Sequence, residues 1–421
     1  MRIDDAALTQ RLALARSARH GWGVVGGALG VMLVTFGVTY SFAPFFASLQ
    51  EAFAASRGAV SLAFSIAVPL YFALGAISGP LADRFGPRRV SLTGIVIGAI
   101  GLVYAAHAQS LWQVYLGWGV GVGICVGFSY VPAIGAVQLW FVKRRGFASG
   151  IAVSGIGLGT LCGPLAAAEL IDWLGWRGAW TALGGVTLVG GAMAVWFLDG
   201  PPERRGMHPD GGVAEPAASV AAAPTTGASL REALASRPFW LLYGALISIS
   251  MGAFIPFVHL VPFAEDHGIE HGTAVAIFSL VGIGSTAGRF CVGGVADRLG
   301  RKRSLAAVFL GVALMMLWWI SSSTPWQLSI FALVYGTCFG AFVALYPALT
   351  VDYFGTRNAS GIIGLLYTAA AFGTLLGPKL AGDAFDIFAS YSVPIAVGGA
   401  FAGLAVVLTL LLPEPARYCK P

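Results

Sequence analysis

The sequence has little charge. Of its 421 residues, 10% are Asp, Glu, Lys or Arg, whereas a soluble domain carries about 25%. Apolar stretches of about 20 residues recur along the chain, which excludes an ordinary soluble protein and predicts a multi-pass membrane protein. The 58 glycines lie largely within these stretches, where small residues let helices approach one another closely in lipid.

The sequence also lacks the patterns of metal, nucleotide and catalytic sites. Its five cysteines show neither a C-x-x-C pair nor metal-ligand spacing, so no metal site is expected. Gly155-Ile156-Gly157-Leu158-Gly159 has the glycines of a dinucleotide fingerprint, but it lacks the preceding strand and the acidic ribose ligand. No nucleophile is paired with a base. We therefore expect neither an enzyme nor a bound cofactor.

The distribution of charge predicts an orientation in the membrane. The net charge of +6 does not indicate nucleic-acid binding, because the cations are spread over short loops. With the N-terminus in the cytoplasm, nearly all of the 25 Lys and Arg residues fall in cytoplasmic segments, while Arg57 and Arg177 fall in external loops. This asymmetry predicts a protein of the cytoplasmic (inner) membrane with both termini in the cytoplasm.

Twelve apolar segments are long enough to cross a bilayer. Backbone groups in lipid must be satisfied within the segment, so these segments are predicted to be helices and the fold to be all-α. They cover about residues 21–46, 58–82, 90–109, 111–140, 147–168, 176–198, 238–264, 273–296, 304–323, 326–351, 359–384 and 391–412.

Residues 199–237 interrupt the apolar pattern. Rich in Ala, Pro, Thr and Gly, they have little to bury and predict a cytoplasmic linker. Ser229-Leu230-Arg231-Glu232 near its end is a capping-box pattern, which predicts a short interfacial helix. The predicted divisions are an N-tail (1–20), an N-lobe with helices 1–6 (21–198), the linker, a C-lobe with helices 7–12 (238–412) and a C-tail (413–421).

The chain repeats itself about half a chain length apart. Gly79–Arg89 (GPLADRFGPRR) returns as Gly293–Arg303 (GGVADRLGRKR), and Gly159–Pro164 returns as Gly373–Pro378. Two copies of a six-helix unit joined by a linker are the parallel-repeat architecture of a two-lobed transporter.

The repeated loop resembles the hallmark loop of the major facilitator superfamily. The resemblance implies the major facilitator fold, an all-α integral membrane protein with twelve transmembrane helices in two six-helix lobes. It also implies that the two copies of the loop take part in conformational gating. The loop residues concerned are Asp83, Arg84, Asp297 and Arg298.

Two further stretches resemble a narrower group. Trp140–Gly155 (WFVKRRGFASGIAVSG) is similar to the helix 4–5 signature of monocarboxylate transporters and oxalate/formate exchangers. His20–Val25 (HGWGVV) resembles the monocarboxylate transporter signature that opens helix 1, although Arg19-His20 stands where an acid is usual. Pro44-Phe45 replaces the proline-lysine pair of the animal proteins, so the proton-relay role of that lysine does not carry over.

Arg289 and Lys379 are cations within predicted helices, and no Asp or Glu lies in the middle of any helix. An intramembrane arginine costs about 2.5–3.5 kcal/mol, and its planar fork fits a carboxylate. The resemblance implies that Arg289 holds the substrate carboxylate, and Lys379 matches a second cation of the oxalate exchangers. The alternatives are that Arg289 reaches the interface or backbone carbonyls, and that Lys379 pairs with Asp383.

Aromatic residues are the other candidates for a substrate site. The resemblance implies that Tyr40, Tyr130, Tyr335 and Phe339 line the cavity, and Tyr367 is a further intramembrane phenol that needs a partner. His259 lies well inside a helix and is the candidate for proton coupling. Its alternative is a neutral histidine bonded to a neighbouring helix.

These features predict a secondary active transporter. We expect proton-coupled symport, by alternating access, of a small organic monocarboxylate such as lactate or pyruvate. The alternatives are an oxalate/formate-type dicarboxylate exchanger, a drug exporter of the same fold and a non-transporting receptor. The expected partners are a carboxylate substrate, the lipid bilayer and protons. Nucleic acid is not expected as a partner, and the protein is expected to be a monomer.

Overall fold

The computed structural model describes residues 5–141, 144–207, 227–355 and 358–414, with the side chains of 5–16, 145, 292–295, 297, 359 and 360 outside that description. These ranges are almost entirely helical. The N-terminal helices are α1 (Asp5–Tyr40), α2 (Phe46–Phe53), α3 (Arg57–Phe85), α4 (Pro87–Ala106), α5 (Leu111–Val114), α6 (Gly121–Trp140) and α7 (Arg145–Trp196). The C-terminal helices are α8 (Leu230–Leu234), α9 (Arg237–Ala253), α10 (Pro256–Asp266), α11 (His271–Leu299), α12 (Arg301–Ile320), α13 (Pro325–Phe354), α14 (Ala359–Phe388) and α15 (Ser392–Leu410).

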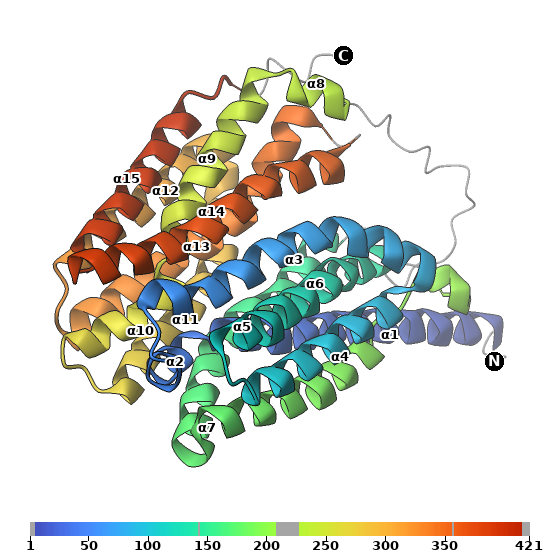
Figure 1. The fold of residues 1–421 in the computed structure, drawn as a ribbon. Coiled ribbons are helices and arrows are strands. Elements are labelled where there is room, and N and C mark those ends of the chain that lie inside the picture. The colour runs from blue at the N-terminus through green and yellow to red at the C-terminus, as the bar shows by residue number, and fades with distance from the viewer. Residues whose placement is uncertain (1–4, 142–143, 208–226, 356–357, 415–421) are drawn as a thin grey trace.

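Eleven segments of the described chain are long and apolar enough to cross a bilayer. One of them, Gly146–Trp196, has 51 residues, although a single crossing needs only about 20. Gly175 breaks this segment with φ 66° and ψ 169°, and the chain reverses direction there (Figure 1). Because α7 therefore crosses twice, the predicted all-α membrane fold with twelve crossings is confirmed.

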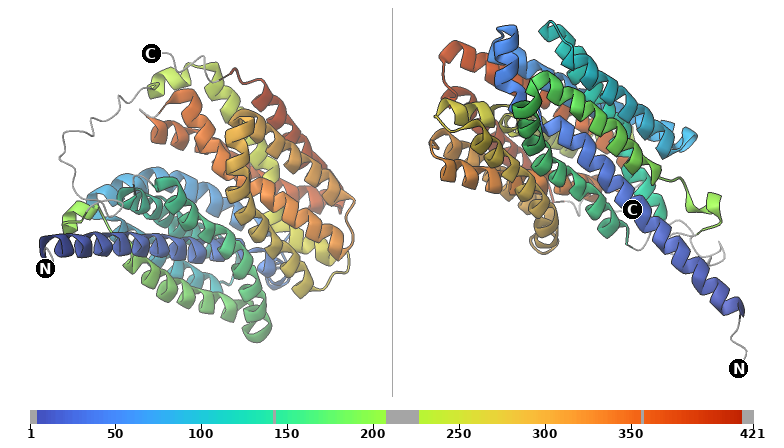
Figure 2. Two further views of the ribbon diagram at one scale, coloured as in Figure 1. Left: turned by 180° about the vertical axis from the view of Figure 1, so that it is seen from behind. Right: turned by 90° about the horizontal axis from the view of Figure 1, so that it is seen from below.

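The helices form two lobes (Figure 1). In one lobe α1 packs on α7 and α4 on α6, and in the other α11 packs on α13 and α12 on α15. Between the lobes, α3 packs on α14 and α7 on α11. The views in Figure 2 show the same two-lobed arrangement from behind and from below. We call the end where α3 and α11 finish, at Phe85 and Leu299, the linker end, and the end where α3 begins, at Arg57, the opposite end.

The repeated sequence motif builds the same turn twice at the linker end. Gly86 has φ 90° and its N–H donates to Ala82, while Gly300 has φ 89° and its N–H donates to Ala296. An L-residue rarely adopts this φ, which explains why glycine stands at both positions.

The second repeat brings pairs of helices into close contact. A Cβ atom at Gly163 of α7 would lie 2.3 Å from the carbonyl oxygen of Gly37 in α1. A Cβ atom at Gly377 of α14 would lie 2.3 Å from the carbonyl oxygen of Met251 in α9. The two lobes therefore use equivalent glycines to let equivalent helices touch.

The tails and the linker are only partly described. Helix α1 begins at Asp5, so the described part of the predicted N-tail is continuous with the first crossing. The start of the linker is docked on the N-terminal lobe, where the Trp140 indole donates to the Gly200 carbonyl at 2.9 Å. The capping box is confirmed, because Ser229 and Glu232 bond to each other's backbone N–H at the start of α8. Residues 208–226 and 415–421 lie outside the description.

The close glycine contacts predict opposite effects of the same substitution. Gly163→Ala places a methyl group against the α1 backbone and should destabilise the protein by about 1–3 kcal/mol. Gly403→Ala is the matched control, because a Cβ there meets nothing within 4 Å and alanine is the better helix former. The midpoint of thermal unfolding in detergent checks this: it should fall for Gly163→Ala only, and an equal response of both variants would contradict the packing described.

Candidate functional site

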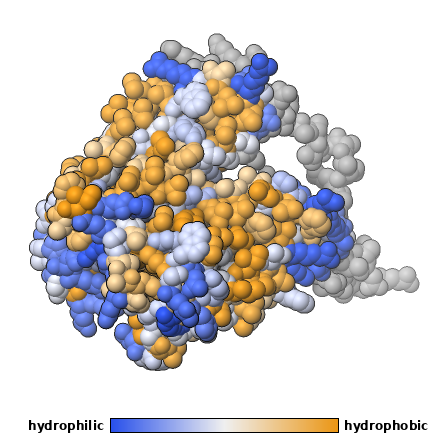
Figure 3. Space-filling view, viewed as in Figure 1, coloured by the Kyte–Doolittle hydropathy of each residue, from blue (hydrophilic) through white to orange (hydrophobic). Residues whose placement is uncertain are grey.

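A cavity of about 770 Å³ lies between the two lobes. Its walls come from α1, α3, α6 and α7 on one side and from α9, α11, α13 and α14 on the other. The lining extends to Pro80 of α3, Leu230 of α8 and Gly361 of α14, all near the linker end. The cavity therefore opens toward the linker end, where the space-filling view shows the lobes apart (Figure 3).

Arg289 lines this cavity from α11. Its Nη1 donates to the Ser285 hydroxyl at 2.8 Å and to the Ser285 carbonyl at 3.4 Å, one turn earlier in the helix. Its Nε is buried and has no hydrogen-bond partner among the residues that the structure describes. Its electrostatic neighbours are the phenols of Tyr40 and Tyr130, and none of the ion pairs found in the described residues includes it. The guanidinium thus has unused donor capacity and a charge that no described carboxylate neutralises.

The structure brings four of the predicted aromatic residues to the cavity, namely Tyr40, Tyr130, Phe339 and Tyr367. Tyr335 lies elsewhere. Its side chain is fully buried and its hydroxyl donates to the carbonyl of Ala253, so it joins α13 to the end of α9. The structure does not place the Tyr335 hydroxyl where a substrate would meet it.

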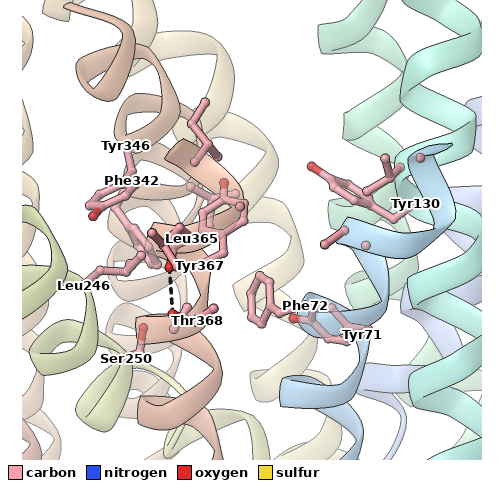
Figure 4. A pocket seen from close by; sticks show the side chains of 18 of the residues that line it. Tyr71, Phe72, Tyr130, Leu246, Ser250, Phe342, Tyr346, Leu365, Tyr367 and Thr368 are labelled. Atoms are coloured by element: carbon pink, nitrogen blue, oxygen red, sulfur yellow. Dashed lines mark hydrogen bonds between the residues drawn. The ribbon is translucent and has the colours of Figure 1, made fainter. Parts of the chain in front are cut away.

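Several cavity residues were missed from the sequence. Figure 4 shows Phe72 of α3 pointing across the cavity toward Tyr367 of α14, and their ring centroids are 5.4 Å apart. The ring of Phe36 lies 6.0 Å from that of Tyr71 and 5.8 Å from that of Tyr130. The adjacent aromatic pair Tyr71-Phe72 was a visible signal, but only the packing of the lobes shows which face of α3 is turned inward.

Lys379 is not brought together with Arg289. It is absent from the lining of the cavity, and its ammonium group pairs with the carboxylate of Asp383 one helical turn further along α14. The structure therefore shows the alternative, in which Lys379 pairs with Asp383. Asp383 can reach Lys379 because residues four apart lie on the same face of a helix.

His259 is fully engaged in hydrogen bonds away from the cavity lining. Its side chain is fully buried, its Nε2 lies 2.9 Å from the Pro378 carbonyl and its Nδ1 lies 3.0 Å from the Tyr391 hydroxyl. A carbonyl only accepts, so Nε2 carries the hydrogen and Nδ1 accepts from Tyr391. The Ser61 hydroxyl, from the other lobe, lies 3.1 Å from Nε2. This is the arrangement of a neutral histidine that joins helices.

Arg57 connects the lobes at the opposite end. Its guanidinium donates to both oxygens of Asp266 at 2.7 and 2.6 Å and to the Tyr391 hydroxyl at 2.8 Å. The backbone N–H groups of Arg57 and Gly58, at the start of α3, each donate to Asp386 at 2.9 Å. We call these five residues the inter-lobe latch. Since the latch joins α3 to α10 and α14, the cavity is closed at this end.

The predicted gating residues lie at the linker end. Asp83, Arg84 and Arg298 are exposed there, at the ends of α3 and α11. The side chain of Asp297 lies outside the described residues. The described residues also contain no group of three His, Cys, Asp or Glu side chains placed to hold a metal ion. A cavity in which one guanidinium keeps an unused donor among aromatic rings is suited to binding an anion.

Comparisons with known proteins agree with this geometry. A family model described as Major Facilitator Superfamily matches residues 28–378 and, in a second match, residues 246–420. The chain is 29% identical to monocarboxylate transporter 12-B of Danio rerio, over 95% of this chain and 88% of that protein. It is 30% identical to monocarboxylate transporter 13 of Rattus norvegicus, over 93% of this chain and 89% of that protein.

A solved structure has the same fold. The crystal structure of a bacterial homologue of the human lysosomal transporter Spinster, in an inward-facing and unoccupied conformation, matches with a TM-score of 0.67. The match covers 95% of this chain and 98% of that one at 14% sequence identity, so it shows the fold alone.

The latch predicts how the lobes respond when Arg57 is removed. Arg57→Gln removes a charge-assisted bidentate bond of roughly 1.5 kcal/mol, which is about a tenfold change in the ratio of closed to separated lobes. Distances between spin labels at Glu51 and Glu270, measured by electron resonance, should gain a longer component. Arg177→Gln is the control, because Arg177 bonds only to the Ala106 and Ala108 carbonyls of its own lobe in the described structure. Distances that stay the same in Arg57→Gln would contradict the latch.

Proposed function

Because this chain belongs to the Major Facilitator Superfamily, we propose that it is a secondary transporter that carries a small organic monocarboxylate, such as lactate or pyruvate, together with a proton. We place it in the cytoplasmic membrane with both termini in the cytoplasm, because the cations gather in the segments at the linker end. The names of the relatives, monocarboxylate transporters 12-B and 13, support this substrate class.

The observation that carries the proposal is Arg289 in the cavity between the lobes. A buried cation without a carboxylate beside it is costly, and a substrate carboxylate offsets that cost by accepting from the free Nε and from Nη. The phenols of Tyr40 and Tyr130 line the same cavity and interact electrostatically with the guanidinium, so they would donate to further carboxylate oxygens of a bound acid. The site therefore binds an anion reversibly, as transport requires.

The two ends of the molecule support alternating access. The cavity is open at the linker end and closed by the inter-lobe latch at the opposite end. With the linker end in the cytoplasm, this conformation releases substrate inward. Rocking the lobes about the central site would break the latch, open the opposite end and bring the loops at Asp83 and Arg84 toward the other lobe.

The proposed proton site is His259, beside the latch. The Tyr391 hydroxyl bridges His259 and Arg57, so the ring lies one hydroxyl away from a cation while the latch is closed. When the lobes separate there, the cation leaves and water reaches the ring. The proton would then bind at Nδ1, the nitrogen that accepts from Tyr391 in the closed state. This links proton binding to the outward-facing conformation.

Dicarboxylate exchange is the alternative, and it requires a second cation in the site. Lys379 is held by Asp383 outside the cavity lining, which favours an acid with one carboxylate.

The double variant Lys379→Met/Asp383→Asn removes both charges together, so no unpaired charge remains. It should retain monocarboxylate uptake.

Substitution of Arg289 tests the binding site. Arg289→Ala should lower uptake of labelled lactate into proteoliposomes by roughly 100-fold or more, since truncating a hydrogen-bonded charge pair costs about 2–5 kcal/mol. Arg289→Lys keeps the charge but loses the fork, and it should retain a small part of the uptake. Unchanged lactate uptake by a folded Arg289→Ala protein would overturn the site.

The proposed coupling of lactate transport to protons is tested by varying the pH gradient across the proteoliposome membrane. Symport predicts that an acidic exterior accelerates lactate uptake into proteoliposomes, and that His259→Gln removes this acceleration while leaving lactate exchange between the two sides. Uptake that responds to an internal carboxylate and not to the pH gradient would select exchange and contradict the proton-coupled mechanism.

A further inference from the structure

We propose that the acid this protein carries joins one carboxylate to a bulky aromatic body, and that Phe72 and Tyr367 bind that body. The inference rests on the proposed function and names its substrate class. It follows from the charge of the cavity wall, from the rings that form it and from their depth relative to Arg289.

The cavity wall carries a single charge. Of the described residues that line the cavity, Arg289 alone is charged, and the other polar side chains of the lining carry hydroxyl groups. A second carboxylate would lie against rings and aliphatic side chains without a countercharge, which is strongly unfavourable in a buried site. The wall therefore fits one carboxylate and otherwise apolar atoms.

Aromatic rings from both lobes face this cavity. Phe72 from α3 and Tyr367 from α14 approach across it with centroids 5.4 Å apart, and Figure 4 shows both side chains turned into the open space. Phe36 lines the same cavity and contacts the rings of Tyr71 and Tyr130. These rings already contact one another, and a ligand ring placed against their cavity-facing surfaces would gain an aromatic attraction beyond the burial of its area.

The rings lie at the depth that the body of a bound acid would reach. Arg289 is about three helical turns from the linker end of α11, Phe72 about three to four turns from the linker end of α3, and Tyr367 about two turns from that of α14. All three side chains line one cavity at similar depth, so we expect an acid with its carboxylate on Arg289 to extend its remaining atoms toward these rings. Lactate is too short to cover them and leaves them in water, whereas an aryl group displaces that water.

Lactate and 3-phenyllactate form a matched pair of probes, because they share the carboxylate and the hydroxyl and differ by one phenyl ring. In proteoliposomes that take up labelled lactate, 3-phenyllactate should inhibit at a concentration about 10- to 100-fold lower than unlabelled lactate, as expected for burial of one ring. Labelled 3-phenyllactate should itself enter the vesicles. Succinate, with a second carboxylate, should inhibit no better than lactate.

Substitutions of Phe72 and Tyr367 test whether these two rings cause the preference for 3-phenyllactate over lactate. Phe72→Ala and Tyr367→Ala should each reduce the preference for 3-phenyllactate over lactate by about tenfold, measured as the ratio of the two inhibitory concentrations within the same variant. Tyr367→Phe keeps the ring and should keep the preference, which also provides a folded variant if the alanine substitution does not fold. Phe372→Ala is the control on the same helix, because Phe372 is 53% exposed and does not line the cavity.

The outcomes separate this inference from the proposed function. If neither acid is taken up, the proposed function fails. If lactate is carried but 3-phenyllactate inhibits no better, or inhibits without entering, the inference fails and the proposed function stands. A preference that survives both alanine substitutions would overturn the assignment to Phe72 and Tyr367.

Discussion

The rest of this structure depends on one electrostatic constraint. The Arg289 guanidinium lines a cavity inside the membrane, and no described carboxylate lies beside it to neutralise its charge. Among the described residues, Arg289 has only Ser285, one turn away, as a hydrogen-bond partner, and its Nε has none. Such a group is costly in a fold that exists only to be stable. We propose that it is retained because a substrate carboxylate neutralises it reversibly. In this proposal the aromatic wall binds the apolar part of the substrate without adding another charge.

The lobes hold this site by two kinds of contact that respond differently to movement. Within each lobe, glycines such as Gly163 and Gly377 let backbones touch, and such contacts tolerate little change in shape. Between the lobes, glycines also bring α7 and α11 together, since a Cβ at Gly282 would lie 2.5 Å from the Gly157 carbonyl oxygen. The latch at Arg57 adds charged and hydrogen-bonded groups, which water would replace if the lobes separate there. His259 lies at the boundary between the lobes, where its ring contacts the Ser61 hydroxyl of the other lobe and the Tyr391 hydroxyl of the latch.

Much of the fold was predictable from the sequence, and less of the site. Hydropathy and the internal repeat determine the crossings because lipid forces every apolar segment into a helix, and the glycine of each repeated loop marks its turn. Arg289 was recognisable because a lone intramembrane cation is rare. Lys379 pairs with Asp383, Tyr335 bonds to a backbone carbonyl, and Phe72 faces inward. These facts depend on side-chain direction and on how the lobes rotate against each other, which a helical pattern rich in apolar residues on every face does not encode.

The most direct test of the central claim is to locate a bound monocarboxylate. A structure determined with an iodine-labelled aryl carboxylic acid would show both ends of the ligand, one by its contacts and the other by its anomalous signal. The account predicts the carboxylate on the Arg289 guanidinium and the iodine beside Phe72 and Tyr367. A carboxylate bound elsewhere, with the donors of Arg289 still unused, would contradict it.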